Sequence, residues 1–214
     1  MINEHPGLER AREEEASNLT WHDMRVTKEL RRNRNGHSSF VVWLTGLSGA
    51  GKSTIASALE TRLFDMGLMT YVLDGDNVRM GLNANLGFSE EDRQENIRRV
   101  AEVSRLFVDA GIVTISSFIS PLDADRVKAR ERFGEGEFIE VFIDCPVEEC
   151  MKRDPKGLYQ KAIAGEIKNF TGINAPYERP QDPEITLRTD QYTVDECVDT
   201  LVAYLKDRGL IFAR

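Results

Sequence analysis

The stretch Gly46-Leu47-Ser48-Gly49-Ala50-Gly51-Lys52-Ser53-Thr54 fits the pattern G-x-x-x-x-G-K-[ST]. Residues 40–44, just before it, are an apolar run that predicts a buried strand, and residues 55–60, just after it, have the pattern of an opening helix. A strand, a glycine-rich loop and a helix start therefore follow one another directly. This order is typical of a loop whose backbone N–H groups, together with the positive end of the helix dipole, hold phosphate oxygens.

Individual residues of this loop, called here the phosphate loop (46–54), have separate expected roles. All of them are expected to surround the phosphates of ATP. Lys52 is expected to reach the outer phosphates, and the Ser53 hydroxyl to ligate Mg²⁺. The alternative is a chance glycine-rich turn. The strand before the loop and the helix after it favour nucleotide binding.

Length and charge limit what surrounds the phosphate loop. The 214 residues, 41% of them hydrophobic, suffice for one well-buried domain with an appendage. A net charge of −8 argues against nucleic acid or an anionic membrane as the partner. No apolar stretch approaches 18 residues and the polar first residues lack a signal-peptide core, so we expect a cytoplasmic protein.

From residue 40 onward, apolar runs alternate with helical patterns, which indicates βα units and a parallel sheet. The long helix is expected to begin near Ser89 and to end at Gly111, and Thr193 with Glu196 predicts a capping box for the last helix. We therefore predict an α/β fold with a doubly wound, five-stranded parallel sheet. Its ligands should bind outside the carboxyl ends of the strands. The expected strands are residues 40–44, 70–73, 112–115, 138–143 and 185–187.

The first 39 residues differ in composition and are interpreted as an N-terminal extension to a catalytic domain at 40–214. Residues 9–15 are a mixed charge run, typical of a solvated or disordered segment. Residues 24–32 could form a short helix that Asn35-Gly36 stops. Since this piece is too small to fold alone, we expect it to pack on the core or on a second subunit.

Cysteine and histidine usage does not suggest a metal site. Cys145, Cys150 and Cys197 fit no C-x-x-C spacing and read as small buried hydrophobic residues. The three histidines, His5, His22 and His37, have no acidic or cysteine partners at ligand spacing, so none is interpreted as a ligand.

The third predicted strand lacks a residue that nucleotide-binding folds often place there. Many such proteins hold Mg²⁺ with an aspartate at the end of a strand, but residues 115–120 contain no acid. Asp74 and Asp76, after the second strand, are the nearest candidates, and a carboxylate there could accept a proton from a substrate hydroxyl. The alternative is that residues 74–77 form only a turn. Beside a phosphate loop, function is the favoured reading.

A cluster of cations follows this acidic pair. Arg79, Arg93 and Arg98 lie close in sequence, and Asn96 lies one helical turn after Arg93. The arginine fork suits phosphate or sulfate oxygens. Ion pairs on the helix surface with the acidic residues Glu90, Glu91, Asp92 and Glu95 fit the spacing equally well. The sequence leaves both readings open.

A long irregular segment later in the chain has the character of a mobile lid. Residues 153–180, the predicted lid segment, are rich in cations and interrupted by glycine and proline. Closure over ATP would bring Arg153 and Lys156 to the phosphates and exclude water. An ordinary solvated surface loop is the alternative.

These residues belong to a longer series of motifs, and in that series the chain resembles the adenylylsulfate kinases. The likeness runs from about Asn18 over nearly the whole chain, and several motifs are not shared with other P-loop kinases. The series consists of Asn18-Leu19-Thr20-Trp21-His22, Trp43-Leu44-Thr45-Gly46-Leu47-Ser48-Gly49, Leu73-Asp74-Gly75-Asp76-Asn77-Val78-Arg79, Gly87-Phe88-Ser89-Glu90-Glu91-Asp92-Arg93-Gln94-Glu95-Asn96-Ile97-Arg98-Arg99, Phe118-Ile119-Ser120-Pro121, Asp154-Pro155-Lys156-Gly157-Leu158-Tyr159, Phe170-Thr171-Gly172-Ile173 and Ala175-Pro176-Tyr177-Glu178. The resemblance implies a P-loop kinase fold. It also implies transfer of the ATP γ-phosphoryl group to the 3′-hydroxyl of adenosine 5′-phosphosulfate, which yields 3′-phosphoadenosine 5′-phosphosulfate and ADP in sulfate assimilation.

The resemblance also implies roles for single residues. Arg79, Arg93 and Asn96 would hold the phosphosulfate substrate, and Phe88 and Phe170 would sandwich its adenine. Packing in the apolar core is the alternative for the two phenylalanines. Their placement in loops beside Gly87 and Gly172 weakens that alternative. Asp76 would be the acid nearest the 3′-hydroxyl, acting as a base or through Mg²⁺. The set of substrate-binding positions is completed by Asp74, Ile119, Ser120 and Lys156.

Ser120 has two readings. Bacterial members of the family are commonly described with a phosphoserine here, so Ser120 is retained with Lys52 and Asp76 as a catalytic position. Ser120-Pro121 followed by Asp123 also reads as a helix N-cap with proline at the first helical position. Because transfer can proceed directly between aligned donor and acceptor, we expect no obligatory phosphoserine intermediate.

The family resemblance further implies a homodimer, and a sulfurylase step performed by a separate protein. Departures from the family pattern are mild: Ala50 stands where serine is common and Met80 where histidine often follows the arginine.

Two rival functions are a kinase for another small molecule and a non-catalytic nucleotide-binding regulator. The first has no reason to combine Arg93 and Asn96 with residues 170–173, and intact Lys52, Ser53 and Asp76 speak against the second.

Overall fold

The computed structural model describes residues 20, 22 and 24–211 of the chain. Its centre is a sheet of five parallel strands in the order β2-β3-β1-β4-β5. The predicted strands are therefore confirmed, with small shifts at their ends. The strands are β1 (Val41–Thr45), β2 (Thr70–Asp74), β3 (Val113–Ser117), β4 (Phe138–Asp144) and β5 (Ile185–Arg188).

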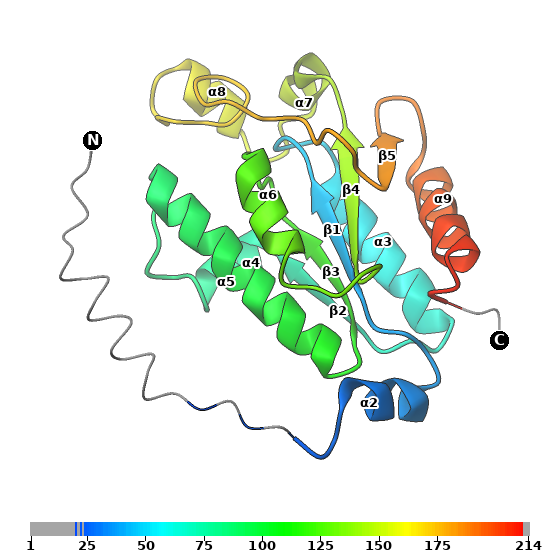
Figure 1. Ribbon diagram of the computed structural model, residues 1–214. Helices are drawn as coiled ribbons and strands as arrows, with labels where there is room; N and C mark the ends of the chain where they lie inside the picture. The colour runs from blue at the N-terminus through cyan, green and yellow to red at the C-terminus, as the bar shows by residue number, and fades with distance from the viewer. Residues whose placement is uncertain (1–19, 21, 23, 212–214) are drawn as a thin grey trace.

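Helices cover both faces of the sheet, as the doubly wound prediction requires (Figure 1). Helices α3 (Lys52–Asp65) and α9 (Val194–Asp207) pack together on one face, and α5 (Glu90–Asp109) and α6 (Asp123–Arg130) pack together on the other. Alternation along β1 explains the two layers, because successive side chains of a strand point to opposite faces. Val42 and Leu44 join the core under α3 and α9, whereas Val41 and Trp43 join the core under α5.

The N-terminal signals of α5 and α9 are confirmed. Ser89 is the N-cap of α5 and accepts a hydrogen bond from the Asp92 N–H. Thr193 and Glu196 form the capping box of α9. The side chains of all three cysteines are buried, in line with their interpretation as core residues.

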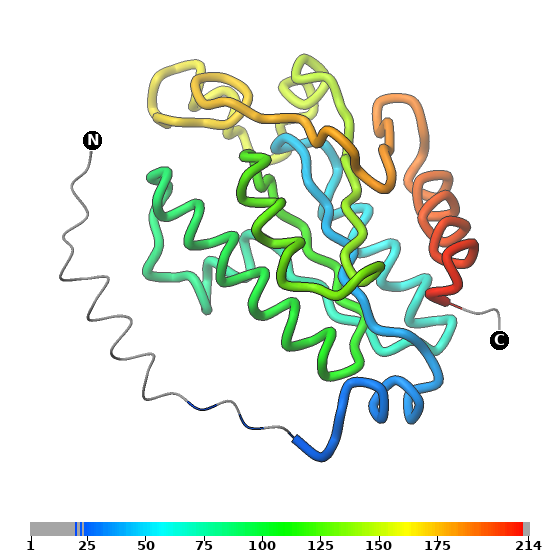
Figure 2. Tube along the Cα trace, viewed as in Figure 1, coloured from blue at the N-terminus to red at the C-terminus, as the bar shows by residue number. Residues whose placement is uncertain are grey.

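Three short helices gather where the strands end: α4 (Gly75–Met80), α7 (Val147–Arg153) and α8 (Leu158–Ile163). Figure 1 places α7 and α8 beyond the arrowheads of the sheet. Figure 2 follows the predicted lid segment, yellow to orange, across this same end. The carboxyl ends of the strands are thus the covered, loop-rich side of the molecule, where the candidate site residues lie.

The helix of the N-terminal extension packs on the core at the opposite end of the sheet (Figure 1). Helix α2 (Lys28–Asn35) begins after its N-cap Thr27 and ends at Gly36, whose φ of 73° is the left-handed conformation that glycine tolerates. Lys28 and Arg32 both pair with Glu137 at 2.6 Å. The predictions for residues 1–19, including His5 and part of the first family motif, lie outside the described residues. No helix in the described ranges is long and apolar enough to cross a membrane.

Candidate active site

The phosphate loop joins the end of β1 to the start of α3 and depends on its glycines. A Cβ at Gly46 would lie 2.6 Å from the carbonyl oxygen of Ile143, too close for any side chain. Gly51 is the N-cap of α3 and has a φ of 101°, which L side chains rarely adopt. The loop therefore delivers its backbone directly to the N-terminus of a 14-residue helix, an arrangement suited to phosphate.

Lys52 is the buried cation of this loop. Its Nζ donates hydrogen bonds to the carbonyl oxygens of Gly46 at 3.0 Å and Leu47 at 2.7 Å. Burial lowers the pKa of Lys52 to about 8, against the opposing pull of nearby groups that include Asp74. Burial removes most of the water that would otherwise solvate this positive charge. An anion bound to the loop would therefore stabilise it.

Ser53 and Asp74 meet at the next position along the loop. Ser53 Oγ donates to Asp74 Oδ2 at 2.7 Å, and Asp74 Oδ1 accepts from the Asp76 N–H at 3.0 Å, which caps α4. In the sheet, Asp74 is paired in register with Ser117 of β3. The carboxylate that β3 lacks is therefore supplied by the neighbouring strand β2. A hydroxyl beside a carboxylate is a hard oxygen donor set that fits Mg²⁺.

Asp76 points to a different partner. Its carboxylate forms an ion pair with Lys156 of the predicted lid segment, and both side chains are more than half exposed. Asp76 and Lys156, which are 80 positions apart in sequence, are thus brought together as expected for one site. Of the two carboxylates that the sequence offers for Mg²⁺, Asp74 and Asp76, the one hydrogen-bonded to Ser53 is that of Asp74.

Arg79 and Phe88 form the next part of the site. The Arg79 guanidinium carbon lies 4.5 Å from the centroid of the Phe88 ring, and Arg79 Nη1 donates to the Gly87 carbonyl at 2.9 Å. Phe88 is 66% exposed, which excludes the core role that was weighed for it. The pKa of Arg79 is lowered, mainly by burial and then by the like charge of Arg93. Two cations near one exposed aromatic ring suit an anionic aromatic ligand.

Arg93 joins two segments that are distant in sequence. Its Nε donates to the Phe88 carbonyl at 3.1 Å, its Nη1 donates to Thr171 Oγ1 at 3.1 Å, and its Nη2 donates to the Asn169 carbonyl. One acceptor belongs to Phe88 itself and the other two belong to the residues on either side of Phe170, the two phenylalanines that the family resemblance assigns to adenine. One guanidinium therefore fastens the Phe88 loop to the Phe170 segment.

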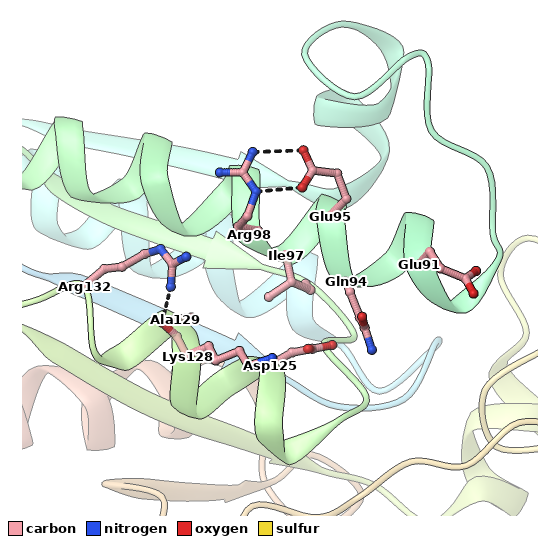
Figure 3. Close-up of a pocket in the computed structure, with 9 residues that line it drawn as sticks. All are labelled: Glu91, Gln94, Glu95, Ile97, Arg98, Asp125, Lys128, Ala129 and Arg132. Carbon is pink, nitrogen blue, oxygen red and sulfur yellow. Dashed lines mark hydrogen bonds and ion pairs between the residues drawn. The ribbon is translucent and has the colours of Figure 1, made fainter. Parts of the chain in front are cut away.

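Asn96 and Arg98 have different surroundings, although both are near Arg93 on α5. Asn96 is 4% exposed and its Oδ1 accepts a hydrogen bond from Asn83 Nδ2 at 2.9 Å. Arg98 instead pairs with Glu95 through two contacts of 2.6 and 2.9 Å, drawn as dashed lines in Figure 3. For Arg98 the structure favours the reading as a surface ion pair. The groove in Figure 3, between α5 and α6, is lined by charged residues that include Arg98.

Ser120 requires a correction. The N-cap of α6 is Leu122, and Ser120, two residues earlier, has a φ of 38°, unlike the extended backbone of an N-cap. Ser120 Oγ is buried and accepts a hydrogen bond from Trp43 Nε1 at 3.2 Å. The N-terminus of α6 is capped instead by Glu178, whose Oε2 accepts from the Asp123 N–H at 2.7 Å. Asp123 is still an acid in the first turn, as predicted.

The predicted lid segment touches the phosphate loop at several points. Tyr159 Oη donates to the Ser48 carbonyl at 2.9 Å, and a Cβ at Gly172 would lie 3.0 Å from Leu47 Cδ2. Phe170 is half-buried and packs edge-on against Tyr159 with a centroid distance of 4.9 Å. Through these contacts the segment forms part of the wall around the loop.

Arg153 reaches the phosphate loop only indirectly. Its Nη2 donates to the Thr189 carbonyl at 2.7 Å, and Thr189 Oγ1 donates to the Ala50 carbonyl at 2.7 Å. Other residues of the phosphate loop are accessible to solvent to different degrees. Ser53 and Thr54 are exposed, and Leu47, Ser48 and Gly49 are half-buried.

A buried arginine that the sequence reasoning missed organises the loop at 119–121. Arg126 is 1% exposed and donates to the carbonyls of Ser120 at 2.7 Å and Glu178 at 2.8 Å. Its Nε also lies 2.9 Å from Glu140 Oε1 of β4. Ile119 is held from the other side, because its carbonyl accepts from Thr45 Oγ1 at 2.7 Å. Arg126 stands in an ordinary amphipathic helix pattern, so no sequence signal marks it.

The comparisons with known proteins agree with this geometry. Residues 38–188 match the family model described as adenylylsulphate kinase. The adenylyl-sulfate kinase of Staphylococcus haemolyticus is 58% identical over 92% of this chain and 99% of its own length, and that of Marinobacter nauticus is 59% identical over 91% and 98%. The structure of the Mycobacterium tuberculosis APS kinase in complex with AMPPNP and APS has a TM-score of 0.76 and 46% identity, and the match covers 79% of this chain and 99% of that one. With relatives more than half identical over nearly its whole length, the chain belongs to the adenylylsulphate kinase family.

Proposed function

We propose that this site transfers the γ-phosphoryl group of ATP to the 3′-hydroxyl of adenosine 5′-phosphosulfate, with the residues in the roles given below. Membership of the family makes the chain a kinase that transfers phosphate to an alcohol group in sulfate assimilation. The observation that carries the residue assignment is the bridge made by Arg93. It donates hydrogen bonds to the Phe88 carbonyl and to Asn169 and Thr171 on either side of Phe170, which supports a single acceptor site that includes both phenylalanines and Arg93.

ATP is proposed to bind through the phosphate loop. Backbone N–H groups of the loop and the N-terminus of α3 would receive the phosphates, and Lys52 would meet the outer ones. Displacing Lys52 Nζ from the carbonyls of Gly46 and Leu47 costs two hydrogen bonds to neutral oxygens, which the phosphate oxygens replace with contacts between opposite charges. Arg153 and Lys156 are proposed to approach the phosphates from the lid segment.

Mg²⁺ is proposed to be held by the oxygen donors at the end of β2. Ser53 Oγ and the carboxylate of Asp74 are already in contact, and Asp76 is the next carboxylate in the chain. Mg²⁺ bound to few protein oxygens and to substrate phosphates is the usual arrangement for phosphoryl transfer. When bound, it supplies charge neutralisation of the phosphate oxygens.

The transfer itself needs alignment more than covalent catalysis. The substrate 3′-oxygen forms a bond to the γ-phosphorus while the bond from that phosphorus to the bridging oxygen of ADP breaks. Asp76 is proposed to accept the hydroxyl proton, with Lys156 as its partner at the lid. The Ser120 hydroxyl is buried and accepts a hydrogen bond from Trp43 Nε1, which supports direct transfer without a phosphoserine intermediate.

The acceptor is proposed to lie between Phe88 and Phe170, with Arg79, Arg93 and Asn96 at its phosphosulfate. Arginine forks match the anionic end, and stacking on the rings suits adenine. Asp74, Ile119, Ser120 and Lys156 complete this proposed substrate set. By the same family resemblance we propose that the chain works as a cytoplasmic homodimer and that another protein performs the sulfurylase step.

The test is an assay of ADP release with Mg²⁺–ATP and one acceptor at a time. We expect turnover with adenosine 5′-phosphosulfate, and a product that mass spectrometry identifies as its 3′-phosphorylated form. Adenosine 5′-monophosphate tests the contribution of the sulfate, and gluconate tests an unrelated alcohol. Turnover with gluconate and none with adenosine 5′-phosphosulfate would refute the proposal.

A further inference from the structure

Asn83 is a fully buried amide that none of the roles above uses. It lies between α4 and α5, and its residue is 0% exposed. Its backbone is satisfied, because its N–H donates to the Val78 carbonyl at 2.9 Å and its carbonyl accepts from the Leu86 N–H at 3.0 Å. Its side chain makes one hydrogen bond, from Nδ2 to Asn96 Oδ1 at 2.9 Å. Burying an amide costs free energy unless it is hydrogen-bonded, so this contact calls for a reason.

The direction of that hydrogen bond has a chemical consequence. A carboxamide has a carbonyl end that accepts and an NH₂ end that donates. With Asn96 Oδ1 committed to Asn83, the donors of Asn96 Nδ2 are the end left for another group. An anionic phosphosulfate needs donors, and a carbonyl oxygen turned towards it would repel it.

The reverse orientation of the pair is the less favourable one. As the pair stands, the buried atom of Asn83 without a hydrogen-bond partner in the described structure is Oδ1. Reversal of both amides would instead leave the Nδ2 donors of Asn83 buried and unpaired. Unpaired buried N–H groups are rarer in proteins than under-used carbonyl oxygens. Asn83 therefore holds Asn96 with its donors outward.

The backbone around Asn83 is fastened to the helix that carries Asn96. Arg99 Nη1 of α5 donates to Asn85 Oδ1 at 2.8 Å and to the Leu82 carbonyl at 3.3 Å. These contacts hold the loop on both sides of Asn83, so the two amides keep a fixed separation. Arg93, one turn before Asn96 on α5, is another of the proposed phosphosulfate ligands.

We propose that Asn83 is a positioning residue that fixes the polarity of the Asn96 carboxamide and so presents N–H donors to the anionic group of the acceptor substrate. The proposal rests on the proposed function, which places Asn96 at the phosphosulfate. Asn83 itself touches no reacting atom.

The test compares steady-state constants for two substitutions of Asn83. Asn83→Leu keeps the size and removes the hydrogen bond, so Asn96 loses its fixed orientation. We expect the KM for adenosine 5′-phosphosulfate to rise about two- to tenfold, as for the loss of one neutral hydrogen bond, with kcat and the KM for ATP nearly unchanged. Asn83→Asp offers only acceptors, which would draw Asn96 Nδ2 inward and turn its oxygen outward. Its KM for the acceptor should rise further than that of Asn83→Leu.

Two controls separate positioning from a structural effect. Gln94→Leu removes an exposed amide of α5, the helix that carries Asn96, and the KM for the acceptor should stay within about twofold of the parent value. In an Asn96→Ala background, Asn83→Leu should have no further effect on that KM, since the group that it orients is gone. Thermal unfolding of each variant shows which are folded, and Asn83→Leu alone suffices should Asn83→Asp fail to fold.

The outcomes distinguish the two proposals. If Asn96→Ala leaves the KM for the acceptor unchanged, the proposed role of Asn96 fails and the inference about Asn83 fails with it. If Asn96→Ala raises that KM but Asn83→Leu does not, or if Asn83→Leu has the same effect with and without Asn96, only the inference about Asn83 is overturned.

Discussion

Ser53 Oγ lies 2.7 Å from Asp74 Oδ2, although β3 lies in the sheet between the strands β1 and β2 that lead to these two residues. Ser53 is at the start of α3, after β1, and Asp74 is the last residue of β2. The contact spans the end of β3, where the register sets Asp74 opposite Ser117. A carboxylate on β2 can thus reach the phosphate-loop hydroxyl. In related folds, an aspartate at the end of another strand commonly binds Mg²⁺ together with that hydroxyl.

The first prediction concerns the charge of Asp74. Asp74→Asn keeps an oxygen that can cap α4 but removes the negative charge beside Ser53. We expect kcat/KM for ATP to fall about tenfold or more, and the Mg²⁺ concentration for half-maximal turnover to rise, because a charge-assisted contact is lost. Turnover measured across a Mg²⁺ series checks this. Asp199→Asn, an exposed partner of Arg62, is the matched control and should leave both constants unchanged.

The second prediction concerns the pH dependence of stability that Lys52 causes. In the folded chain the pKa of Lys52 is lowered from 10.5 to about 8 by burial. Between those two pH values the unfolded chain therefore binds a proton that the folded chain has released. Stability from this group rises with pH across that window, and below about pH 8 the full cost of burying the charge remains.

Comparison with Lys52→Met isolates this effect. Groups such as Tyr177, whose pKa burial raises to about 12, destabilise the fold at high pH but act equally in both proteins. We expect Lys52→Met to be more stable than the parent at pH 7, inactive, and to lose that advantage progressively from pH 8 to 10.5. Urea unfolding at several pH values measures the difference. A difference independent of pH would show that Lys52 keeps its ordinary pKa.

The fold was predictable because its signals are local. Apolar runs mark the strands, and the caps Ser89 and Thr193 act within three residues of themselves. The N-cap prediction for Ser120 was wrong because a contact between residues distant in sequence replaces the local one. Ser120-Pro121 resembles an N-cap, but the acceptor that caps α6 is Glu178, 55 positions away in sequence. Sequence spacing carries no information about that contact.

The sequence predicts which residues belong to the site better than it predicts which partners each of them contacts. Arg93 and Arg98 had the same two readings, and only the structure shows that Arg93 bonds to the segment at 169–171 while Arg98 pairs with Glu95. The helical period turns residues five positions apart to different sides of α5. Which side meets the lid segment depends on packing between distant parts of the chain. Arg126 was missed for the same reason, since all its partners other than Asp123 lie outside its own helix.

The third prediction concerns the buried ion pair of Arg126 and Glu140. Their side chains are 1% and 10% exposed, and their atoms Nε and Oε1 lie 2.9 Å apart. Arg126→Met leaves Glu140 with only its longer contact to Arg130, at 3.3 Å. Because an uncompensated buried charge is costly, we expect a loss of about 3–5 kcal/mol in the free energy of unfolding.

A second substitution distinguishes charge from packing. Adding Glu140→Gln to Arg126→Met should recover part of the loss, since the buried charge is then removed. Arg62→Met breaks an exposed ion pair with Asp199 and should cost no more than about 1 kcal/mol. Urea unfolding of the four proteins gives these values. A cost for Arg126→Met as small as that of Arg62→Met would contradict the role of Arg126 as the buried support of residues 119–121.

The fourth prediction concerns the Arg93 bridge. Arg93→Ala removes a cation at the proposed phosphosulfate and three hydrogen bonds that join the Phe88 loop to the lid segment. Thr171→Val removes only one of those bonds and keeps the side-chain shape. We expect kcat/KM for adenosine 5′-phosphosulfate to fall about tenfold or more in Arg93→Ala, and about two- to tenfold in Thr171→Val.

ATP binding decides how that fourth result is interpreted. Calorimetric titration with ATP alone should give nearly the parent Kd for both variants, because neither residue contacts the phosphate loop. Arg105→Ala, a half-buried cation of the same helix paired with Glu102, should change neither constant. Equal losses for ATP and for the acceptor in Arg93→Ala would mean that Arg93 supports α5 and the lid segment as a structural clamp. A loss confined to the acceptor, larger in Arg93→Ala than in Thr171→Val, is what a ligand-binding guanidinium held in place by Thr171 requires.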